Sequence, residues 1–120
     1  MLRELNEGAH RYVYDATVES VYDGDTVTLT VDLGFGISRH GHKVRLYGIN
    51  APEVRGAERH DGIAARNWLR SRLPAGSSIV IKSHRDKTGK FGRWLGTLYK
   101  DGVDLNALMV EAGYAEFREY

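Results

Sequence analysis

Acidic, amide and arginine side chains recur in this sequence at positions where a strand is expected to end. They are Asp25, Arg45, Asn50, Glu53 and Arg93. Arginine carries a planar fork of donors that can form two hydrogen bonds with one phosphate, so the two arginines are candidate phosphate-binding groups. They would also offset the negative charge that grows on a phosphate under attack. This set of residues therefore indicates chemistry on a phosphate.

The oxygen-bearing members of the set predict a site for a hard cation. Asp25 and Asn50 offer a carboxylate and an amide oxygen to calcium or magnesium, and the backbone carbonyl of Ala51 can add a third ligand. Glu53 can hold and deprotonate a water molecule. We therefore expect a metal site beside a catalytic base.

Each of these residues also has an ordinary explanation. A solvated strand end or turn accommodates an arginine or a carboxylate without any function, and Asp23-Gly24 is a strong hairpin signal in its own right. The turn explains Asp25 poorly, because Asp25 continues the apolar row that runs through alternate residues from Val27 to Val31. With a period of two, its carboxylate lies at the end of the buried face.

Five segments carry the alternating, β-branched or aromatic residues that are typical of strands. They are residues 12–22, 25–32, 43–49, 78–82 and 91–99. The segment 33–42, with two glycines around Phe35, is expected to form a loop or a wide hairpin between the second and third strands. In the last strand, Trp94, Leu95 and Leu98 are expected in the core.

Two further segments show the 3.6-residue apolar period of amphipathic helices. Residues 58–73 predict a helix with Asp61 as its N-cap, stopped by Pro74. Residues 104–113 predict a shorter helix capped by Asp104. Both helices have one apolar face that must pack against the strands.

The order of three strands, a helix, two strands and a helix predicts a β-barrel with helices, an α+β fold. It matches a five-stranded Greek-key barrel of the OB type with two helices. Residues 12–120 are expected to form this single domain after a flexible N-terminal segment at residues 1–11. Since one fold serves many functions, the fold alone does not decide what the protein does.

Composition excludes several classes of protein. The chain of 120 residues has a formal net charge of only +1 and contains no cysteine, which rules out disulfides and thiol chemistry. It has no apolar run as long as a membrane helix, and its N-terminus lacks the apolar region of a signal peptide. A cytoplasmic location is therefore the default expectation, or a secreted one if the chain is a trimmed mature form.

Four sequence blocks resemble the thermonuclease family, the proteins with staphylococcal-nuclease-like domains. The blocks are Asp23-Gly-Asp-Thr26, Arg45-Leu-Tyr-Gly-Ile-Asn-Ala-Pro-Glu53, Phe91-Gly-Arg93-Trp and Asp104-Leu-Asn-Ala-Leu-Met-Val-Glu-Ala-Gly113. The resemblance covers roughly residues 12–117, and the order and spacing of the blocks make it specific. It implies an OB-fold, calcium-dependent phosphodiesterase that acts on DNA and RNA and leaves 3′-phosphates.

The resemblance also implies roles for individual residues. Asp25 would be a metal ligand, and Glu53 would be the proposed base. Arg45 and Arg93 would be the phosphate-binding arginines. Lys90 would correspond to a lysine near the terminal phosphate of the nucleotide.

Two features depart from the family's pattern. Asn50 replaces the second metal carboxylate, so the site lacks one negative charge and its calcium affinity should fall. The C-terminal helix of longer relatives is largely absent, because the sequence ends at Tyr120. The expected function is an endonuclease with little sequence specificity. The alternative is a catalytically inactive OB-fold module that binds nucleic acid or protein; the oligomeric state stays open.

Overall fold

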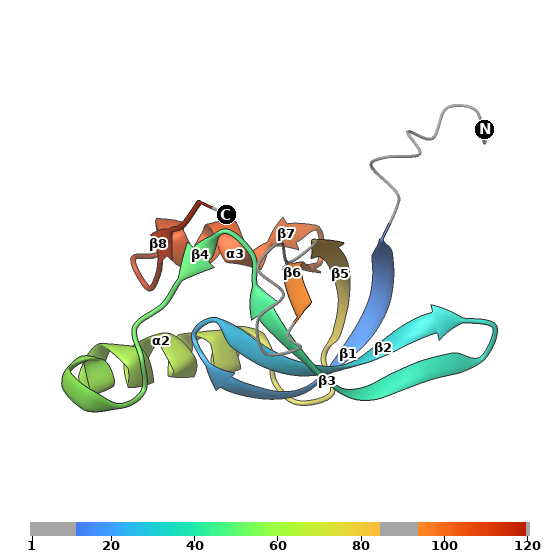
Figure 1. Ribbon diagram of the computed structural model, residues 1–120, viewed down its shortest axis with the longest axis horizontal. Helices are drawn as coiled ribbons and strands as arrows, with labels where there is room; N and C mark the ends of the chain where they lie inside the picture. Colours follow the sequence, from blue (N-terminus) through green and yellow to red (C-terminus); the bar gives the residue numbers. More distant parts are fainter. Residues whose placement is uncertain (1–11, 85–93, 120) are drawn as a thin grey trace.

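Five strands form a closed barrel in the computed structural model, which describes residues 12–84 and 94–119. The strands are β1 (Val13–Asp23), β2 (Thr26–Gly34), β3 (Ile37–Leu46), β5 (Ser78–His84) and β6 (Trp94–Lys100) (Figure 1). Their order is β3-β2-β1-β5-β6, and a parallel pairing between β3 and β6 closes the barrel. The five-stranded barrel predicted from the sequence is thereby confirmed.

The β1–β2 hairpin turns at Gly24 and Asp25, so that Asp23 pairs with Thr26. The turn lies one residue later than the Asp23-Gly24 turn expected from the sequence. Along β2 the predicted alternation is present, since its valines and leucine up to residue 31 are buried and the threonines between them are half-buried. Asp25 thus lies in the turn itself, directly before a strand with one buried face.

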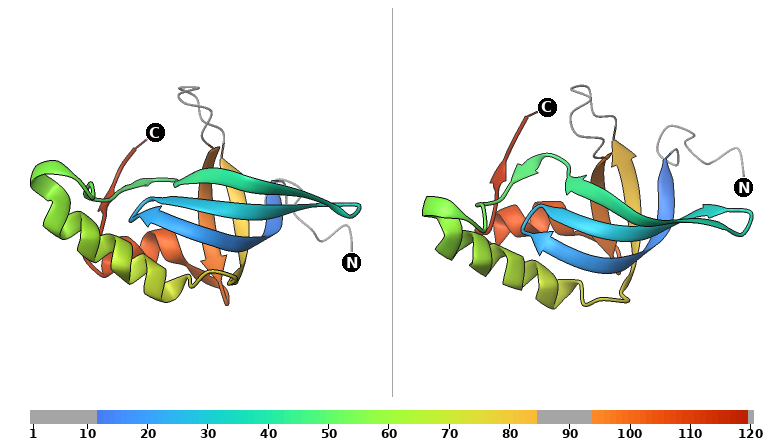
Figure 2. Two further views of the ribbon diagram at one scale, coloured as in Figure 1. Left: turned by 90° about the horizontal axis from the view of Figure 1, so that it is seen from below. Right: turned by 60° about the horizontal axis from the view of Figure 1, so that its bottom comes forward.

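β2 and β3 continue beyond the barrel as a projecting two-stranded ribbon (Figure 1, Figure 2). A hairpin joins the second and third strands as one of the two expected alternatives, but it is tight and not wide, because only Phe35 and Gly36 remain between the strands. The side chains of residues 33–41 are exposed. Because no buried face requires alternation there, the period-two pattern that identifies the other strands is missing.

The described part of the chain contains two α-helices. α2 (Arg59–Arg72) follows a short 3-10 turn, η2 (Gly56–Glu58), and ends before Pro74 as predicted. The expected cap at Asp61 is wrong, because Asp61 lies inside the first turn of α2. Its negative charge there interacts favourably with the positive end of the helix dipole, although its side chain does not cap a backbone N–H.

α3 (Leu105–Glu111) is capped as the sequence predicts. The side chain of Asp104 accepts a hydrogen bond from the N–H of Ala107 at 3.0 Å. Three short strands complete the structure beside it: β7 (Val103–Asp104) pairs with β6, and β4 (Ile49–Asn50) pairs with β8 (Glu116–Phe117). The β4–β8 pair holds the segment that leaves β3 against the C-terminal part of the described chain.

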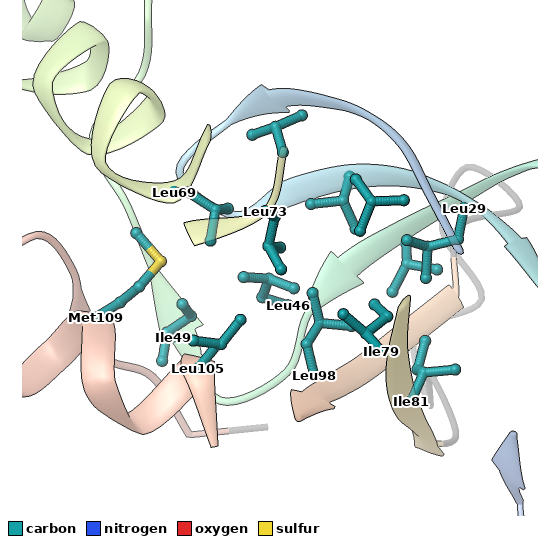
Figure 3. Close-up of a cluster of buried hydrophobic side chains, with 14 of the residues drawn as sticks. Leu29, Leu46, Ile49, Leu69, Leu73, Ile79, Ile81, Leu98, Leu105 and Met109 are labelled. Atoms are coloured by element: carbon teal, nitrogen blue, oxygen red, sulfur yellow. The ribbon is translucent and has the colours of Figure 1, made fainter. Parts of the chain in front are cut away.

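The core fills the barrel and reaches both helices (Figure 3). Leu29, Leu46 and Leu98 are fully buried in the barrel, where Leu69 of α2 and Met109 of α3 join the same cluster. None of the helices in residues 12–84 or 94–119 has the length and apolar character of a membrane span.

The two tryptophans differ from each other in burial. Trp68 of α2 is partly buried against the core and stacks on Tyr114, with ring centroids 5.4 Å apart. Trp94, which was expected in the core with Leu95 and Leu98, is instead 49% exposed, while the two leucines are buried as predicted. Trp94 is the first residue of β6, so it lies at the rim of the barrel rather than in its interior.

Candidate functional site

Two aspartates are buried at the β1–β2 turn. The relative exposures of Asp23 and Asp25 are 6% and 7%. Asp23 Oδ1 accepts a hydrogen bond from the N–H of Asp25 at 3.0 Å, and Asp25 Oδ1 accepts one from the Thr26 hydroxyl at 3.3 Å. Burial and then the negative charge of Asp25 raise the pKa of Asp23 to about 6. The turn therefore concentrates negative charge where little water can solvate it.

Arg45, at the end of β3, compensates this charge. Its neighbours Val44 and Leu46 belong to the core, so strand alternation directs Arg45 to the other side, where it is only 7% exposed. Arg45 Nη2 lies 3.4 Å from Asp25 Oδ2. Nη1 donates to the backbone carbonyls of Leu46 at 3.3 Å and Ile49 at 3.0 Å. These contacts fix the guanidinium in one orientation.

β4 brings two further groups to the same point. Arg45 Nη2 donates to Asn50 Oδ1 at 3.0 Å, in addition to its contact with Asp25. The N–H of Ala51 donates to Asp25 Oδ2 at 2.9 Å. Four residues that the sequence singled out, Asp25, Arg45, Asn50 and Ala51, thus meet at one place although 26 positions separate the first from the last.

Asn106, buried on α3, fastens the turn that leads into β4. Its Nδ2 donates to the carbonyls of Tyr47 at 2.9 Å and Gly96 at 3.0 Å. Its Oδ1 accepts from the N–H of Leu98 at 3.2 Å. The side chain therefore ties the β3–β4 turn to β6, a role that the sequence analysis missed. The available signal was an amide beside the apolar stripe of the last helix.

Glu53 follows the cluster by two residues, and its side chain is exposed. Its backbone is held from two directions. The N–H donates to Glu58 Oε1 at 3.4 Å, and the carbonyl lies so close to Gly62 of α2 that a Cβ there would overlap it. Helix α2 therefore determines where the Glu53 carboxylate leaves the backbone, at the solvent edge of the buried cluster.

The oxygens at this cluster suit a hard cation, although few of them are charged. Asp25 Oδ1 accepts one long hydrogen bond, so this carboxylate retains lone pairs for a ligand bond. Burial is the main cause of the raised pKa of Asp23, and the negative charge of Asp25 adds to it; a cation at this place would offset that second contribution. Among the described residues, no three His, Cys, Asp or Glu side chains gather as a metal site. A cation bound here would therefore depend on Asn50, backbone carbonyls and water as well as on Asp25.

Arg93 and Lys90 lie outside the described residues, so their phosphate-binding roles stay predictions. The described part of β6 begins at Trp94, which pairs with Val44, and the next pair joins Leu95 to Arg45. β6 therefore starts beside the end of β3 that carries Arg45.

Asp23 is the other residue whose importance the sequence analysis underrated. It was expected to be an ordinary turn residue, yet it is buried against Asp25. A second aspartate two positions before Asp25, at the end of the first expected strand, was the available signal.

Comparison with known proteins agrees with this geometry. Residues 43–120 match the family model described as staphylococcal nuclease homologue. The chain is also 29% identical over 111 residues to endonuclease YhcR of Bacillus subtilis (strain 168). That alignment covers 85% of this chain but 9% of the relative, so the chain spans a small part of that protein's length. The family match includes Arg45, Asn50 and Glu53, whereas Asp25 precedes it.

Proposed function

Because this chain belongs to the family of staphylococcal nuclease homologues, we propose that it is a nuclease domain that hydrolyses phosphodiester bonds in DNA or RNA. The proposed activity requires calcium, or magnesium as the alternative ion, and has little sequence specificity. The observation that carries the proposal is the contact of the buried Arg45 with both Asp25 and Asn50. It joins a cation suited to phosphate with oxygens suited to a metal.

Arg45 would bind phosphate at the edge of the guanidinium that contacts Asn50. Nη1 is engaged by two backbone carbonyls, whereas the Asn50 side chain is exposed and meets Nη2 through one hydrogen bond. A phosphate oxygen would therefore compete with Asn50 Oδ1 for Nη2. This exchange would release the amide oxygen of Asn50 to the cation. Arg93 and Lys90 are the further proposed partners of the phosphate.

Glu53 would accept the proton of the attacking water. Its exposure allows that proton to pass on to solvent. Calcium, held by Asp25, Asn50 and the Ala51 carbonyl, would neutralise phosphate charge and make the water easier to deprotonate. Departure of the 5′-oxygen would leave 3′-phosphate products. Because phosphate contacts carry no base information, cleavage would occur at many sequences.

The Bacillus relative is named an endonuclease, which favours cleavage within a strand. The second candidate function is a catalytically inactive OB-fold module that binds nucleic acid or protein. Its supporting observation is that both terminal nitrogens of Arg45 already contact protein oxygens. The neutral Asn50 in place of a carboxylate points in the same direction.

Cleavage by the purified protein distinguishes the two candidates. Supercoiled plasmid, single-stranded DNA and RNA are each incubated with calcium, with magnesium or with a chelator. We expect cleavage in calcium and none in the chelator. Glu53→Gln should lower the rate about 100-fold to 10,000-fold while leaving nucleic-acid binding unchanged.

The matched control is Glu111→Gln, which alters an exposed glutamate on α3 and should cleave like the parent. Binding without cleavage in either ion would establish the inactive module. Cleavage that persists in the chelator would contradict the metal requirement.

A further inference from the structure

A hollow of about 180 Å³ opens at the root of the β2–β3 ribbon. All five barrel strands contribute to its wall, with Tyr14, Leu33, Arg39, His42, Ile81 and Trp94 among the lining residues. Leu33 and Arg39, at the base of the ribbon, line it. Figure 1 shows that the ribbon projects from one end of the barrel and that α2 lies toward the other. Among the described residues assigned to the phosphate or the metal, namely Asp25, Arg45, Asn50 and Ala51, none lines it.

Two aromatic rings meet at this hollow. Trp94 is 49% exposed, and its ring centroid lies 5.8 Å from that of His42, with the planes inclined by 34°. Leu33 on the facing strand is 46% exposed. A half-exposed tryptophan over an apolar hollow offers a flat surface on which another planar group can stack.

A β-bulge in β3 directs two side chains to the same hollow. Leu29 pairs with His42 and Val31 pairs with Arg39, so β3 contains one more residue than β2 between these two pairs. In a regular strand, residues three positions apart point to opposite faces. The extra residue removes this conflict, and both Arg39 and His42 line the hollow.

The bulge is held in place by Glu19 of β1. Gly41 has φ of 65°, a conformation that favours glycine. Glu19 Oε2 accepts hydrogen bonds from the N–H of Gly41 and from the Thr30 hydroxyl, both at 2.7 Å. A bulge anchored by a side chain from another strand is a stable feature, and it re-aims residues as bulges beside binding sites commonly do.

The charge at the hollow favours an anionic partner. Among the described residues that line it there is one full cation, Arg39, and no carboxylate. Burial and the neighbouring charge of Arg39 lower the pKa of His42, which favours the neutral form of its ring. A neutral aromatic pair beside one guanidinium matches a base and its neighbouring phosphate better than it matches an apolar peptide or a second cation.

We propose that this hollow is a base-stacking subsite for single-stranded nucleic acid, in which an unpaired base stacks on Trp94 and Arg39 binds an adjacent phosphate. The inference rests on the proposed nuclease function. His42 precedes Arg45 by three residues on β3, which corresponds to about 10 Å along the strand, and the two side chains point to opposite faces, so the nucleic acid must span several nucleotides to occupy both places. A base in a duplex is already paired and stacked and must be extruded before it can enter. The subsite therefore makes single strands the preferred substrate.

The test measures binding of a short oligothymidylate in chelator, so that cleavage does not interfere. Trp94→Ala should raise the Kd about fivefold to a hundredfold, the usual effect of losing one aromatic stacking partner. Trp94→Phe keeps a ring and should bind close to the parent value. The matched control is Phe35→Ala, because Phe35 is fully exposed at the tip of the same ribbon and does not line the hollow.

Two further measurements isolate stacking from charge. Binding should quench the tryptophan fluorescence of the parent but not that of Trp94→Phe, since Trp68 packs away from the hollow against Tyr114. An oligonucleotide with abasic sites should bind the parent as weakly as the intact strand binds Trp94→Ala. Thermal melts of all variants verify that each is folded.

An unchanged Kd in folded Trp94→Ala would overturn the inference, as would an equal loss in Phe35→Ala. Equal affinity of the parent for duplex and single strand would overturn it too. These outcomes are separate from failure of the proposed function. A parent that cleaves without any dependence on Trp94 refutes the subsite alone, while Trp94-dependent binding without cleavage refutes the nuclease alone.

Discussion

The two ends of this barrel differ in how far their functional side chains are exposed to solvent. At the β1–β2 turn, Asp25 and Arg45 are each 7% exposed, and the arginine contacts four protein oxygens. At the root of the ribbon, Trp94 and Leu33 are about half exposed around a hollow. Among the described residues no buried side-chain nitrogen or oxygen lacks a partner. The first end is therefore a fixed polar network, and the second is an open apolar surface.

This difference follows from what each end must hold. A buried charge is tolerated only when it is paired and hydrogen-bonded, which also fixes its position. Fixed donors are what a reacting phosphate requires, because they need no reorganisation during the reaction. A stacking surface needs no such precision, since every base offers a flat face. If the proposed function is correct, the buried end would carry the chemistry and the open end would bind the substrate.

The difference between the two ends is tested most strongly by removing one arginine from each end. Arg45→Ala leaves Asp25 buried without its partner, so the free energy of unfolding should fall by about 3–5 kcal/mol. Arg39→Ala removes an exposed side chain and should change stability by less than about 0.5 kcal/mol. Urea unfolding in chelator measures both values. Cleavage by Arg45→Ala should fall at least about 100-fold.

Arg45→Lys separates charge from geometry in the same assay. Lysine retains a positive charge but has one nitrogen, so it cannot keep the Nη1 contacts with two backbone carbonyls and the Nη2 contacts with Asp25 and Asn50 at the same time. We expect an intermediate loss of stability and a rate close to that of Arg45→Ala. If Arg45→Ala were as stable as Arg39→Ala, the buried network would contribute nothing to the fold, and the contrast between the two ends would disappear.

The next largest effect is expected at Gly62, where α2 touches the Glu53 backbone. Helix propensity alone predicts that Gly62→Ala stabilises the protein by about 1 kcal/mol. The new Cβ would, however, overlap the Glu53 carbonyl and lie 2.8 Å from Val54 N. We expect a loss of about 1–3 kcal/mol instead, together with slower cleavage as Glu53 is displaced.

Urea unfolding measures whether Gly62→Ala raises or lowers the free energy of unfolding, and this sign decides whether α2 positions Glu53. Ala64→Ser, at an exposed position on the same helix, serves as the control and should leave cleavage unchanged. A stabilised Gly62→Ala variant would mean that α2 can move away without consequence, so that it does not position Glu53.

Features with a buried face could be predicted from the sequence. β2 and α3 were identified because their apolar periods reflect contact with the core, and Asp104 caps α3 as expected. The ribbon at residues 33–42 was missed because both of its faces are solvated, which removes the alternation that marks a strand. Trp94 was assigned to the core from its residue type, but the rim of a barrel also accommodates a tryptophan.

The candidate site could likewise be predicted only in part. Residue types and spacing identified Asp25, Arg45 and Asn50, because each ends a strand with a chemically distinctive group. Their shared contact at Arg45 Nη2 could not be predicted, since it depends on how β4 folds back beside the β1–β2 turn. Asn106 was missed for a similar reason: besides its partners on β6, it binds the carbonyl of Tyr47 in the β3–β4 turn, 59 positions away in the sequence.

The smallest expected effect concerns Asn50, and it sharpens the account of the buried end. Asn50→Asp adds a second carboxylate next to Asp25 in a side chain of almost the same shape. Without metal, the new charge is repelled by Asp25 but attracted by Arg45 Nη2, which already lies 3.0 Å from the Asn50 oxygen. The two effects oppose each other, so the stability in chelator should change by less than about 1 kcal/mol.

Calcium affinity should respond more clearly, because it depends on the number of charged ligands. We expect Asn50→Asp to bind calcium about tenfold more tightly by calorimetry, which corresponds to about 1.4 kcal/mol. Since calcium binds only the folded protein at this site, thermal melts should show a larger stabilisation by calcium in the variant than in the parent. Asn67→Asp adds the same charge at an exposed position of α2 and should leave both measurements unchanged. If Asn50→Asp bound calcium no better than Asn67→Asp, Asn50 would not be a ligand, and its amide would serve only to hold Arg45.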